Sequence, residues 1–234
     1  MSIPKIIHYC WFGGNDEPND FQKNLKSWKK HAPEYRIMRW DESNFDVEQY
    51  PYTRIQYQRG RLDLVSDFVR LLMVEAHGGF YLDVDVELVA PLTPLLTNQC
   101  FWGLEDFDSI ASGLIFGAEP HHVDVQALLK IYQDNARDKT FLHQNCVTIT
   151  TNYFRNLGFK YFDRLQLVSA SQIYPTIYFC PRKYGNQHSK LSAMTISIHH
   201  YVQPNRPTRR HIRIGRLIRR IIGRDLFYQY IKIK

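Results

Sequence analysis

Short apolar runs alternate with amphipathic stretches along most of the chain. The apolar runs predict strands, at residues 3–12, 80–84, 101–104, 113–118, 173–179 and 195–199, and the alternating pattern of residues 35–40 predicts another. The stretches with apolar residues three and four positions apart predict helices, at residues 20–30, 60–77, 122–135 and 148–157. Strands that alternate with helices in this way predict an α/β domain.

The helix predicted over residues 60–77 has the clearest pattern. Apolar side chains recur along one of its faces, at Leu62, Val65, Val69, Leu72, Met73 and Ala76. Gly78 and Gly79 follow, as glycines commonly do at the C-terminus of a helix. A buried strand over residues 80–84 is expected directly after this break.

Two carboxylates lie at the end of that strand. Asp83 and Asp85 are one residue apart, and such side chains share one face of an extended chain. Their neighbours are apolar, so burying these acids costs free energy unless they are paired or bind a metal. Oxygen ligands suit a hard cation such as Mg²⁺ or Mn²⁺, and such a cation suits a diphosphate leaving group. This chemistry points to a glycosyltransferase that uses a sugar nucleotide.

Asp67 and Arg70 lie on one face of the preceding helix, three residues apart. They could form a local surface ion pair. Alternatively, Asp67 accepts hydrogen bonds from sugar hydroxyls, and Arg70 binds sugar or phosphate oxygens. The glycines and the carboxylate pair that follow favour the second interpretation.

Trp11 lies at the C-terminal end of the first predicted strand, just before Gly13 and Gly14. A loop at the C-terminal end of a strand can approach a ligand closely. The indole could therefore stack on a nucleobase, or it could pack in the core, and the sequence leaves both interpretations open.

The composition is that of a globular protein, with 234 residues, 44% hydrophobic and 23% charged. The four cysteines form no CxxC pair, which predicts buried, reduced thiols. The sequence has no apolar run long enough to span a membrane, and its N-terminus lacks the features of a signal peptide. These observations predict a cytoplasmic protein.

The net charge of +7 is concentrated at the C-terminus. Residues 206–234 contain ten Lys or Arg and one acid, a charge of +9, which leaves −2 for residues 1–205. The sequence therefore predicts a main domain over 1–205 and a basic tail over 206–234. A nucleic-acid-binding domain would be more evenly basic, so no nucleic-acid partner is expected.

Within the tail, residues 208–222 have a helical pattern with isoleucine and leucine on one face and arginine on the other. A basic amphipathic helix suits an anionic membrane surface, which would place the protein on the inner face of the membrane. The alternative is a helix docked on the body of the protein with a solvated arginine face.

Three segments in combination resemble glycosyltransferase family 32, at residues 3–14, 66–85 and 173–181. The pair His199-His200 matches as well, so the resemblance runs from residue 3 to about residue 200. It implies a GT-A fold with a mixed, mostly parallel central sheet flanked by helices. It also implies a divalent cation, usually Mn²⁺ and otherwise Mg²⁺, and transfer with retention of anomeric configuration.

The resemblance also implies roles for individual residues. Trp11 falls on the tryptophan that stacks on the base, and Tyr81 falls on a residue that lines the donor. Asp67 and Arg70 fall on the contacts to the donor sugar. These four residues belong to the predicted donor site, and Asp67 and Arg70 also belong to the predicted catalytic set.

The resemblance implies that the carboxylate pair binds the metal. Asp83 falls on the acid shared between the ribose and the metal, and Asp85 falls on the catalytic ligand of the metal and diphosphate. The family commonly has a Gly-Ser-Trp element shortly after the His-His pair, and this chain lacks it. The polar candidates left to complete the site are His199, His200 and Asn205. We assign His199 to the metal and His200 to the donor.

The predicted reaction moves a hexose from a UDP- or GDP-sugar to a hydroxyl of a glycan or lipid-linked acceptor, in surface polysaccharide or lipopolysaccharide synthesis. No carboxylate has the features of a nucleophile, which favours attack from the same face with the leaving phosphate as base. Glu105 and Asp106, after an apolar strand, are candidates to contact the acceptor.

Two other functions compete. A glycan- or membrane-binding protein that has lost catalysis would fit the missing Ser-Trp element, although intact Asp83 and Asp85 argue against it. A haloacid-dehalogenase-like phosphatase would fit the apolar strand and DxDxV pattern of residues 80–86. In that family, however, the motif normally opens the domain.

Overall fold

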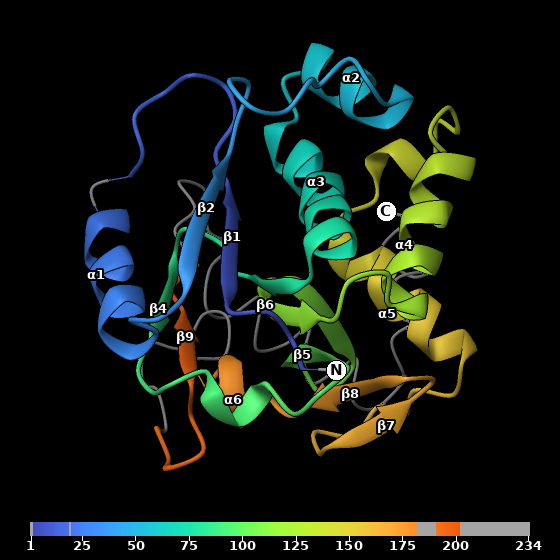
Figure 1. Ribbon diagram of the computed structural model, residues 1–234. Coiled ribbons are helices and arrows are strands. Elements are labelled where there is room, and N and C mark those ends of the chain that lie inside the picture. Colours follow the sequence, from blue (N-terminus) through green and yellow to red (C-terminus); the bar gives the residue numbers. More distant parts are fainter. Residues whose placement is uncertain (1, 19, 182–190, 202–234) are drawn as a thin grey trace, which may run out of the picture.

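The protein is built around one seven-stranded sheet (Figure 1). A computed structural model describes residues 2–18, 20–181 and 191–201. The strand order is β2-β1-β3-β6-β5-β8-β7. The strands are β1 (Ile6–Cys10), β2 (Arg36–Trp40), β3 (Gly79–Tyr81), β5 (Cys100–Asp106), β6 (Ser109–Ala118), β7 (Gln166–Val168) and β8 (Ser171–Tyr174). All run in one direction except β6 and β7, which confirms a mixed, mostly parallel sheet.

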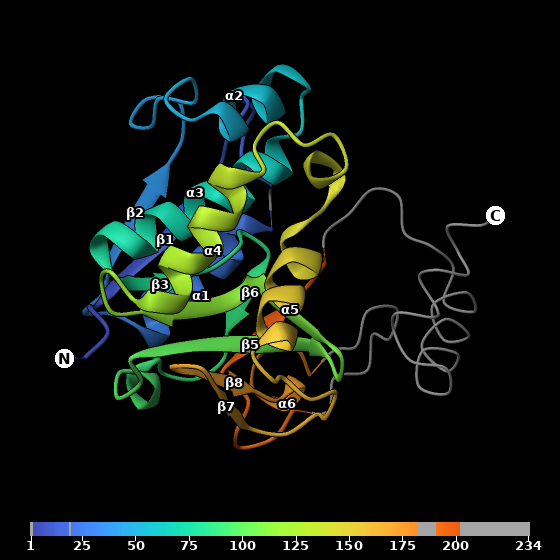
Figure 2. The ribbon, with the colours of Figure 1, turned by 90° about the vertical axis from the view of Figure 1, so that its right-hand side faces the viewer.

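Helices cover both faces of this sheet (Figures 1 and 2). The helices are α1 (Phe21–His31), α2 (Pro51–Gln58), α3 (Leu62–His77), α4 (Val123–Asp134), α5 (Cys146–Asn156) and α6 (Thr176–Phe179). α3, α4 and α5 lie on one face, and α1 and α6 lie on the other. Two 3₁₀ turns, η1 (Thr93–Leu95) and η2 (Phe141–His143), complete the described helical elements.

The sheet separates two hydrophobic clusters. Along β3, Phe80 belongs to the cluster around Trp28 of α1, whereas the adjacent Tyr81 belongs to the cluster around Phe68 of α3. Successive side chains of a strand point to opposite faces, so a strand with helices on both sides must be apolar throughout. This burial explains why the central strands β1, β3 and β6 consist mostly of buried residues, whereas the edge strand β2 includes exposed residues.

A second, two-stranded sheet pairs β4 (Val86–Leu88) with β9 (Ser197–His199). The pairing is antiparallel and places Val86 opposite His199. It brings the late histidine beside the carboxylates that directly precede β4.

Two sequence expectations are wrong in detail. The strand predicted over 80–84 ends at Tyr81, and Asp83 and Asp85 lie in a turn in which the Val86 N–H donates to the Asp83 carbonyl at 3.0 Å. The strand predicted over 173–179 ends at Tyr174, because Pro175 is followed by the short helix α6. The Asp163 carboxylate caps this helix by accepting the Thr176 N–H at 2.7 Å.

The other predicted elements are present within a few residues of their expected ends, and all four cysteines are buried thiols as predicted. α2, β4 and β7 were not anticipated, because they are too short to show a period in the sequence. The tail over 206–234, its predicted helix over 208–222 and Asn205 lie outside the described residues.

The buried side chain of His8 is expected to make the stability of the protein sensitive to acid. Its Nδ1 accepts from the Trp40 indole at 3.1 Å and its Nε2 donates to the Gly78 carbonyl at 2.9 Å, so the ring is held neutral. Burial lowers the pKa of His8 from 6.5 to about 4. Between pH 6.5 and pH 4, His8 therefore binds a proton in the unfolded chain but stays neutral in the folded protein. We expect His8 alone to remove about 2 kcal/mol of unfolding free energy between pH 7 and pH 5.

Urea unfolding of the protein and of His8→Gln at both pH values measures this effect. The variant should start from a lower stability, since its amide can replace only one of the two hydrogen bonds. Its further loss between pH 7 and pH 5 should be smaller by about 2 kcal/mol. Equal losses in the two proteins would contradict the prediction.

Candidate active site

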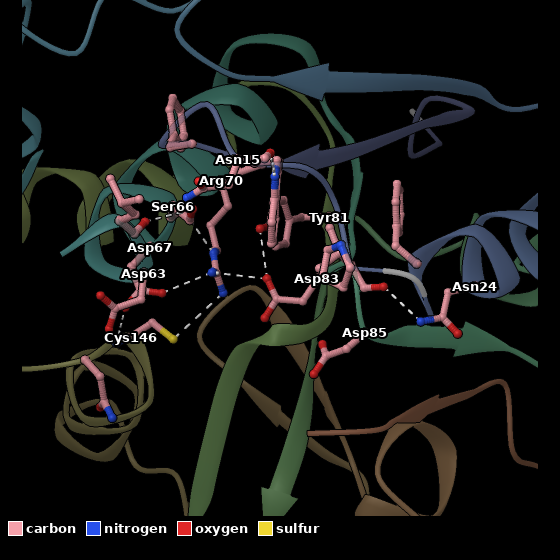
Figure 3. A pocket seen from close by; sticks show the side chains of 18 of the residues that line it. Asn15, Asn24, Asp63, Ser66, Asp67, Arg70, Tyr81, Asp83, Asp85 and Cys146 are labelled. Atoms are coloured by element: carbon pink, nitrogen blue, oxygen red, sulfur yellow. Dashed lines mark hydrogen bonds and ion pairs between the residues drawn. The ribbon is translucent and has the colours of Figure 1, made fainter. Parts of the chain in front are cut away.

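A cavity of about 510 Å³ lies at the C-terminal ends of β1 and β3 (Figure 3). Its wall is formed by five segments: the end of β1 and the loop after it, the start of α1, the first half of α3, the end of β3 with the turn that carries Asp83 and Asp85, and the start of α5. In sheets of this kind, ligands bind beyond the carboxyl ends of the strands. The fold therefore places this cavity where a ligand is expected.

Arg70 lies at the centre of the polar wall and joins two carboxylates. Its Nη2 lies 3.1 Å from Asp67 Oδ1 and 3.2 Å from Asp83 Oδ1 (Figure 3). Its Nε donates to the Ser66 carbonyl at 3.1 Å, and the guanidinium lies over the Tyr81 ring. Burial opposes its charge, but Asp83, Tyr81 and Asp67 together raise the pKa of Arg70 well above its ordinary value.

Asp67 is held from the opposite side by the start of α5. The Cys146 N–H donates to Asp67 Oδ2 at 2.8 Å, while Asp67 Oδ1 faces Arg70. Burial raises the pKa of Asp67, and the opposing effect of Arg70 does not cancel it. Both carboxylate oxygens thus have a fixed partner at the cavity wall.

Asp83 is fixed by three neighbours. Its Oδ1 accepts from the Tyr81 hydroxyl at 2.9 Å as well as facing Arg70. Its backbone N–H donates to the Gly113 carbonyl at 3.3 Å. A β-carbon on Gly113 would lie only 2.3 Å from Asp83 Oδ2, so β6 must have glycine at this position. Burial raises the pKa of Asp83 despite the opposing charge of Arg70.

Asp85 and His199 complete a group of three possible metal ligands. Asp85 Oδ1 lies 2.9 Å from His199 Nε2, and ligand atoms of Asp83, Asp85 and His199 all lie within 4.8 Å of one another. Burial disfavours a charged His199, but Asp85 and then Asp83 outweigh it and raise the pKa of the ring. Two carboxylates and an imidazole fit Mn²⁺ well, and Mg²⁺ less well because it prefers oxygen alone. The residues present therefore fit the cation implied by the sequence.

His200 lies differently from its neighbour. Its Nε2 lies 2.9 Å from Glu87 Oε2, and its backbone N–H donates to the Asp85 carbonyl at 3.0 Å. Neither histidine is among the residues that line the cavity, but His199 reaches Asp85 whereas the His200 side chain faces Glu87. The side chain of His200 as a donor contact stays a prediction, whereas its backbone supports the carboxylate turn.

Trp11 lines the cavity, as do Phe12 and Leu62. Its indole N–H donates to the Asn15 carbonyl at 2.7 Å, which fixes the ring orientation. The same loop is held by Glu42, whose Oε1 accepts the Gly13 N–H at 2.6 Å. The position suits a base-stacking residue, and that role stays a prediction.

Glu105 and Asp106, the candidates for acceptor contact, lie at the end of β5 and do not line this cavity. Other residues that line the cavity could not be recognised as site residues from the sequence pattern alone. Asn145 and Cys146 begin α5, and the Asn145 side chain caps that helix by accepting the Thr148 N–H at 3.0 Å. The Asn-x-x-Thr spacing before a helical pattern is a capping signal that could have located this wall.

Comparison with known proteins agrees with this geometry. Residues 18–102 match the family model described as "Glycosyltransferase sugar-binding region containing DXD motif". These residues include α3, Arg70 and both carboxylates of the turn. This part of the chain resembles a glycosyltransferase DXD region. The resemblance to glycosyltransferase family 32 is therefore confirmed.

Sequence relatives of the DXD region include two named for mannosyl transfer. Inositol phosphoceramide mannosyltransferase 3 of Schizosaccharomyces pombe is 36% identical over 99 residues, which is 41% of this chain and 28% of the relative. Mannosyl phosphorylinositol ceramide synthase CSH1 of Saccharomyces cerevisiae is 26% identical over 140 residues, 57% of this chain and 37% of the relative. The chain thus spans well under half the length of these relatives.

The similarity to solved structures extends beyond the DXD region. The PaToxG glycosyltransferase superposes with a TM-score of 0.55 at 16% identity, covering 66% of this chain and 69% of that one. A glycosyltransferase involved in glycosylation of the major capsid of PBCV-1 superposes with a TM-score of 0.50 at 13% identity, covering 89% and 97%. The fold is GT-A, as predicted. No helix in the described part of the chain is long and apolar enough to cross a membrane.

Proposed function

We propose that this protein is a retaining, metal-dependent glycosyltransferase that moves a hexose from a UDP- or GDP-sugar to a hydroxyl of a glycan or lipid-linked acceptor. One observation carries the proposal. Ligand atoms of Asp83, Asp85 and His199 converge within 4.8 Å of one another. Both of these carboxylates line, together with the Asp67–Arg70 pair, a cavity large enough for a nucleotide sugar.

The roles follow from where charge develops. When bound at Asp83, Asp85 and His199, a divalent cation would neutralise the departing diphosphate. Arg70 supplies a second, permanent positive charge at that position, already oriented by two carboxylates. Asp67 orients the sugar through its hydroxyls. We infer attack from the same face, with a leaving-phosphate oxygen taking the acceptor proton; accumulation of a covalent glycosyl-enzyme would contradict this.

The mannosyl names of the two yeast relatives suggest which substrates to test first. A mannose donor and a lipid-linked acceptor are the leading choices. Surface polysaccharide or lipopolysaccharide synthesis is the pathway that we propose for such an acceptor.

A donor screen tests the proposal. The protein is incubated with Mn²⁺ and a panel of UDP- and GDP-sugars, with and without a lipid-linked acceptor, and release of UDP or GDP is measured. Release from one donor that Asp85→Ala abolishes would support the transferase and name its sugar. If no donor is consumed and calorimetry shows no Mn²⁺-dependent nucleotide binding, the degenerate binding protein becomes the better explanation.

Gly113 provides a site-specific prediction. In Gly113→Ala, the added methyl group would displace the Asp83 carboxylate, which it approaches to 2.3 Å. We expect UDP or GDP release to fall about a hundredfold, because misplaced catalytic groups commonly cost that much. The rate of release by the folded variant is the measurement.

Gly117→Ala is the matched control, because it adds the same methyl group on the same strand. There the β-carbon would meet Phe101 at 2.7 Å in the core and would not reach the carboxylates. It should lower the melting temperature with little effect on the rate per folded molecule. Similar rates in the two variants would contradict a role for Gly113 in placing Asp83.

The basic tail leads to a proposal on location, from sequence alone. We propose that residues 208–222 hold the enzyme on the inner, anionic face of a membrane. Removing residues 206–234 is expected to release the protein from vesicles containing phosphatidylserine in a sedimentation assay. Circular dichroism serves as the control for folding. Equal sedimentation of the full-length and shortened proteins would contradict the proposal.

A further inference from the structure

A second cavity, of about 390 Å³, lies beside α4 and α5. These two helices lie next to each other on the face of the molecule that Figure 2 presents. The cavity is bounded by the end of α4, the η2 turn and one face of α5. It shares no lining residue with the active-site cavity and has a volume typical of small-ligand sites.

Carboxamide side chains supply the polar atoms of this cavity. They are Asn135, Gln144, Asn152 and Asn156. Within the described part of the chain, no hydrogen bond engages the side-chain amides of Gln144, Asn152 and Asn156, whereas Asn135 donates one N–H to the Ile131 carbonyl at 2.9 Å. Each carboxamide can both donate and accept hydrogen bonds, so the cavity offers both functions from several directions.

The rest of the lining is apolar or aromatic. It consists of Ile131, Phe141, Ile149, Tyr153 and Leu157. The Tyr153 hydroxyl donates to Asp124 at 2.7 Å, so this residue presents its ring rather than its polar atom. No charged side chain lines the cavity.

We propose that this second cavity, a groove lined by α4, η2 and α5, binds a neutral oligosaccharide at a site separate from the catalytic cavity. A sugar ring has apolar C–H faces and hydroxyl edges, and every hydroxyl both donates and accepts. Apolar and aromatic walls match the faces, and carboxamides match the edges. Nucleotides and anionic lipids fit poorly, because burying their charge without a cationic partner costs free energy.

The location gives such binding a use. Gln144 lines the groove, and the next two residues, Asn145 and Cys146, line the catalytic cavity. A glycan chain held in the groove would keep its other end near the donor site at a raised effective concentration. Binding itself does not depend on the proposed transfer, so the two proposals can fail separately.

The experiment uses the full chain without donor or cation. Neutral trisaccharides of mannose, glucose and galactose are titrated by NMR, following the side-chain amide signals, with trigalacturonic acid as the charged comparison. Asn152→Asp keeps the shape of the side chain but replaces its N–H donors with a charge. Gln133→Glu makes the same chemical change at an exposed position outside the groove.

At least one neutral trisaccharide should shift amide signals and bind tenfold or more weakly to Asn152→Asp. Gln133→Glu and Asp85→Asn should bind it as the unaltered protein does. Absence of binding by every neutral trisaccharide, equal binding to Asn152→Asp, or loss of binding in Asp85→Asn would each overturn the inference. The donor screen on the same preparation reports separately on the proposed transferase.

Discussion

Replacing Asp85 by asparagine is expected to lower donor turnover about a thousandfold, or about 4 kcal/mol in activation free energy. The change keeps the shape of the side chain but removes its negative charge. In the unaltered protein, Asp85 Oδ1 lies 2.9 Å from His199 Nε2. A neutral amide is a weak ligand for a hard divalent cation. The rate of UDP or GDP release at saturating donor and Mn²⁺ is the measurement.

The exposed Asp46 is a suitable control, since Asp46→Asn makes the same change away from the cavity. That variant should keep the rate of the unaltered protein. Mn²⁺ titration by calorimetry adds a readout that is independent of turnover, and Asp85→Asn should bind the cation much more weakly. Unchanged cation affinity in Asp85→Asn would contradict the proposed ligand set even if turnover fell.

Arg70→Met is expected to abolish turnover and to lower the unfolding free energy by about 3–5 kcal/mol, the usual result of removing one partner of a buried ion pair. Arg70 lies between Asp67 and Asp83, and the change leaves both carboxylates without their cation. Burial already raises the pKa of each acid. Their pKa values should rise further in the variant, so its stability defect should increase with pH through the acid range.

Arg70→Lys separates the two effects. Lysine keeps the charge, so stability should recover in part, but a single ammonium cannot reproduce the planar contacts to two carboxylates. Turnover should therefore stay low. Urea unfolding at pH 5 and pH 8, together with donor turnover, measures both effects, and the exposed Arg137→Met controls for loss of a surface charge. Unaltered stability of Arg70→Met would show that the pair does not support the fold.

The sequence was most informative where a long period and its breaks coincide. The helix from Leu62 to His77 has a clear apolar stripe and ends at glycine, so its presence and the face that carries Asp67 and Arg70 could be predicted. The convergence of Asp83 and Asp85 was also correctly expected, although for an incorrect reason. The two acids share a site because both lie in one turn, not because they alternate along a strand.

Other parts of the site could not be read from the sequence. The contact between Asp67 and α5 uses the backbone N–H of Cys146, which every residue except proline carries, so no side-chain pattern reports it. The need for glycine at position 113 arises from a crossing of β6 with the carboxylate turn, which only the assembled sheet defines. β4 is three residues long, too short for any periodicity, so its pairing with β9 could not be predicted.

The pairing of β4 with β9 has a consequence for how the site is assembled. A cation held by Asp85 and His199 would join a turn in the first half of the chain to one of its last described strands, closing a long loop. The residues matched by the family model contain both carboxylates but not the histidine. Completion of the proposed cation site would thus be a late, non-local folding event, and the bound ion would act as a staple that secures the C-terminal strand.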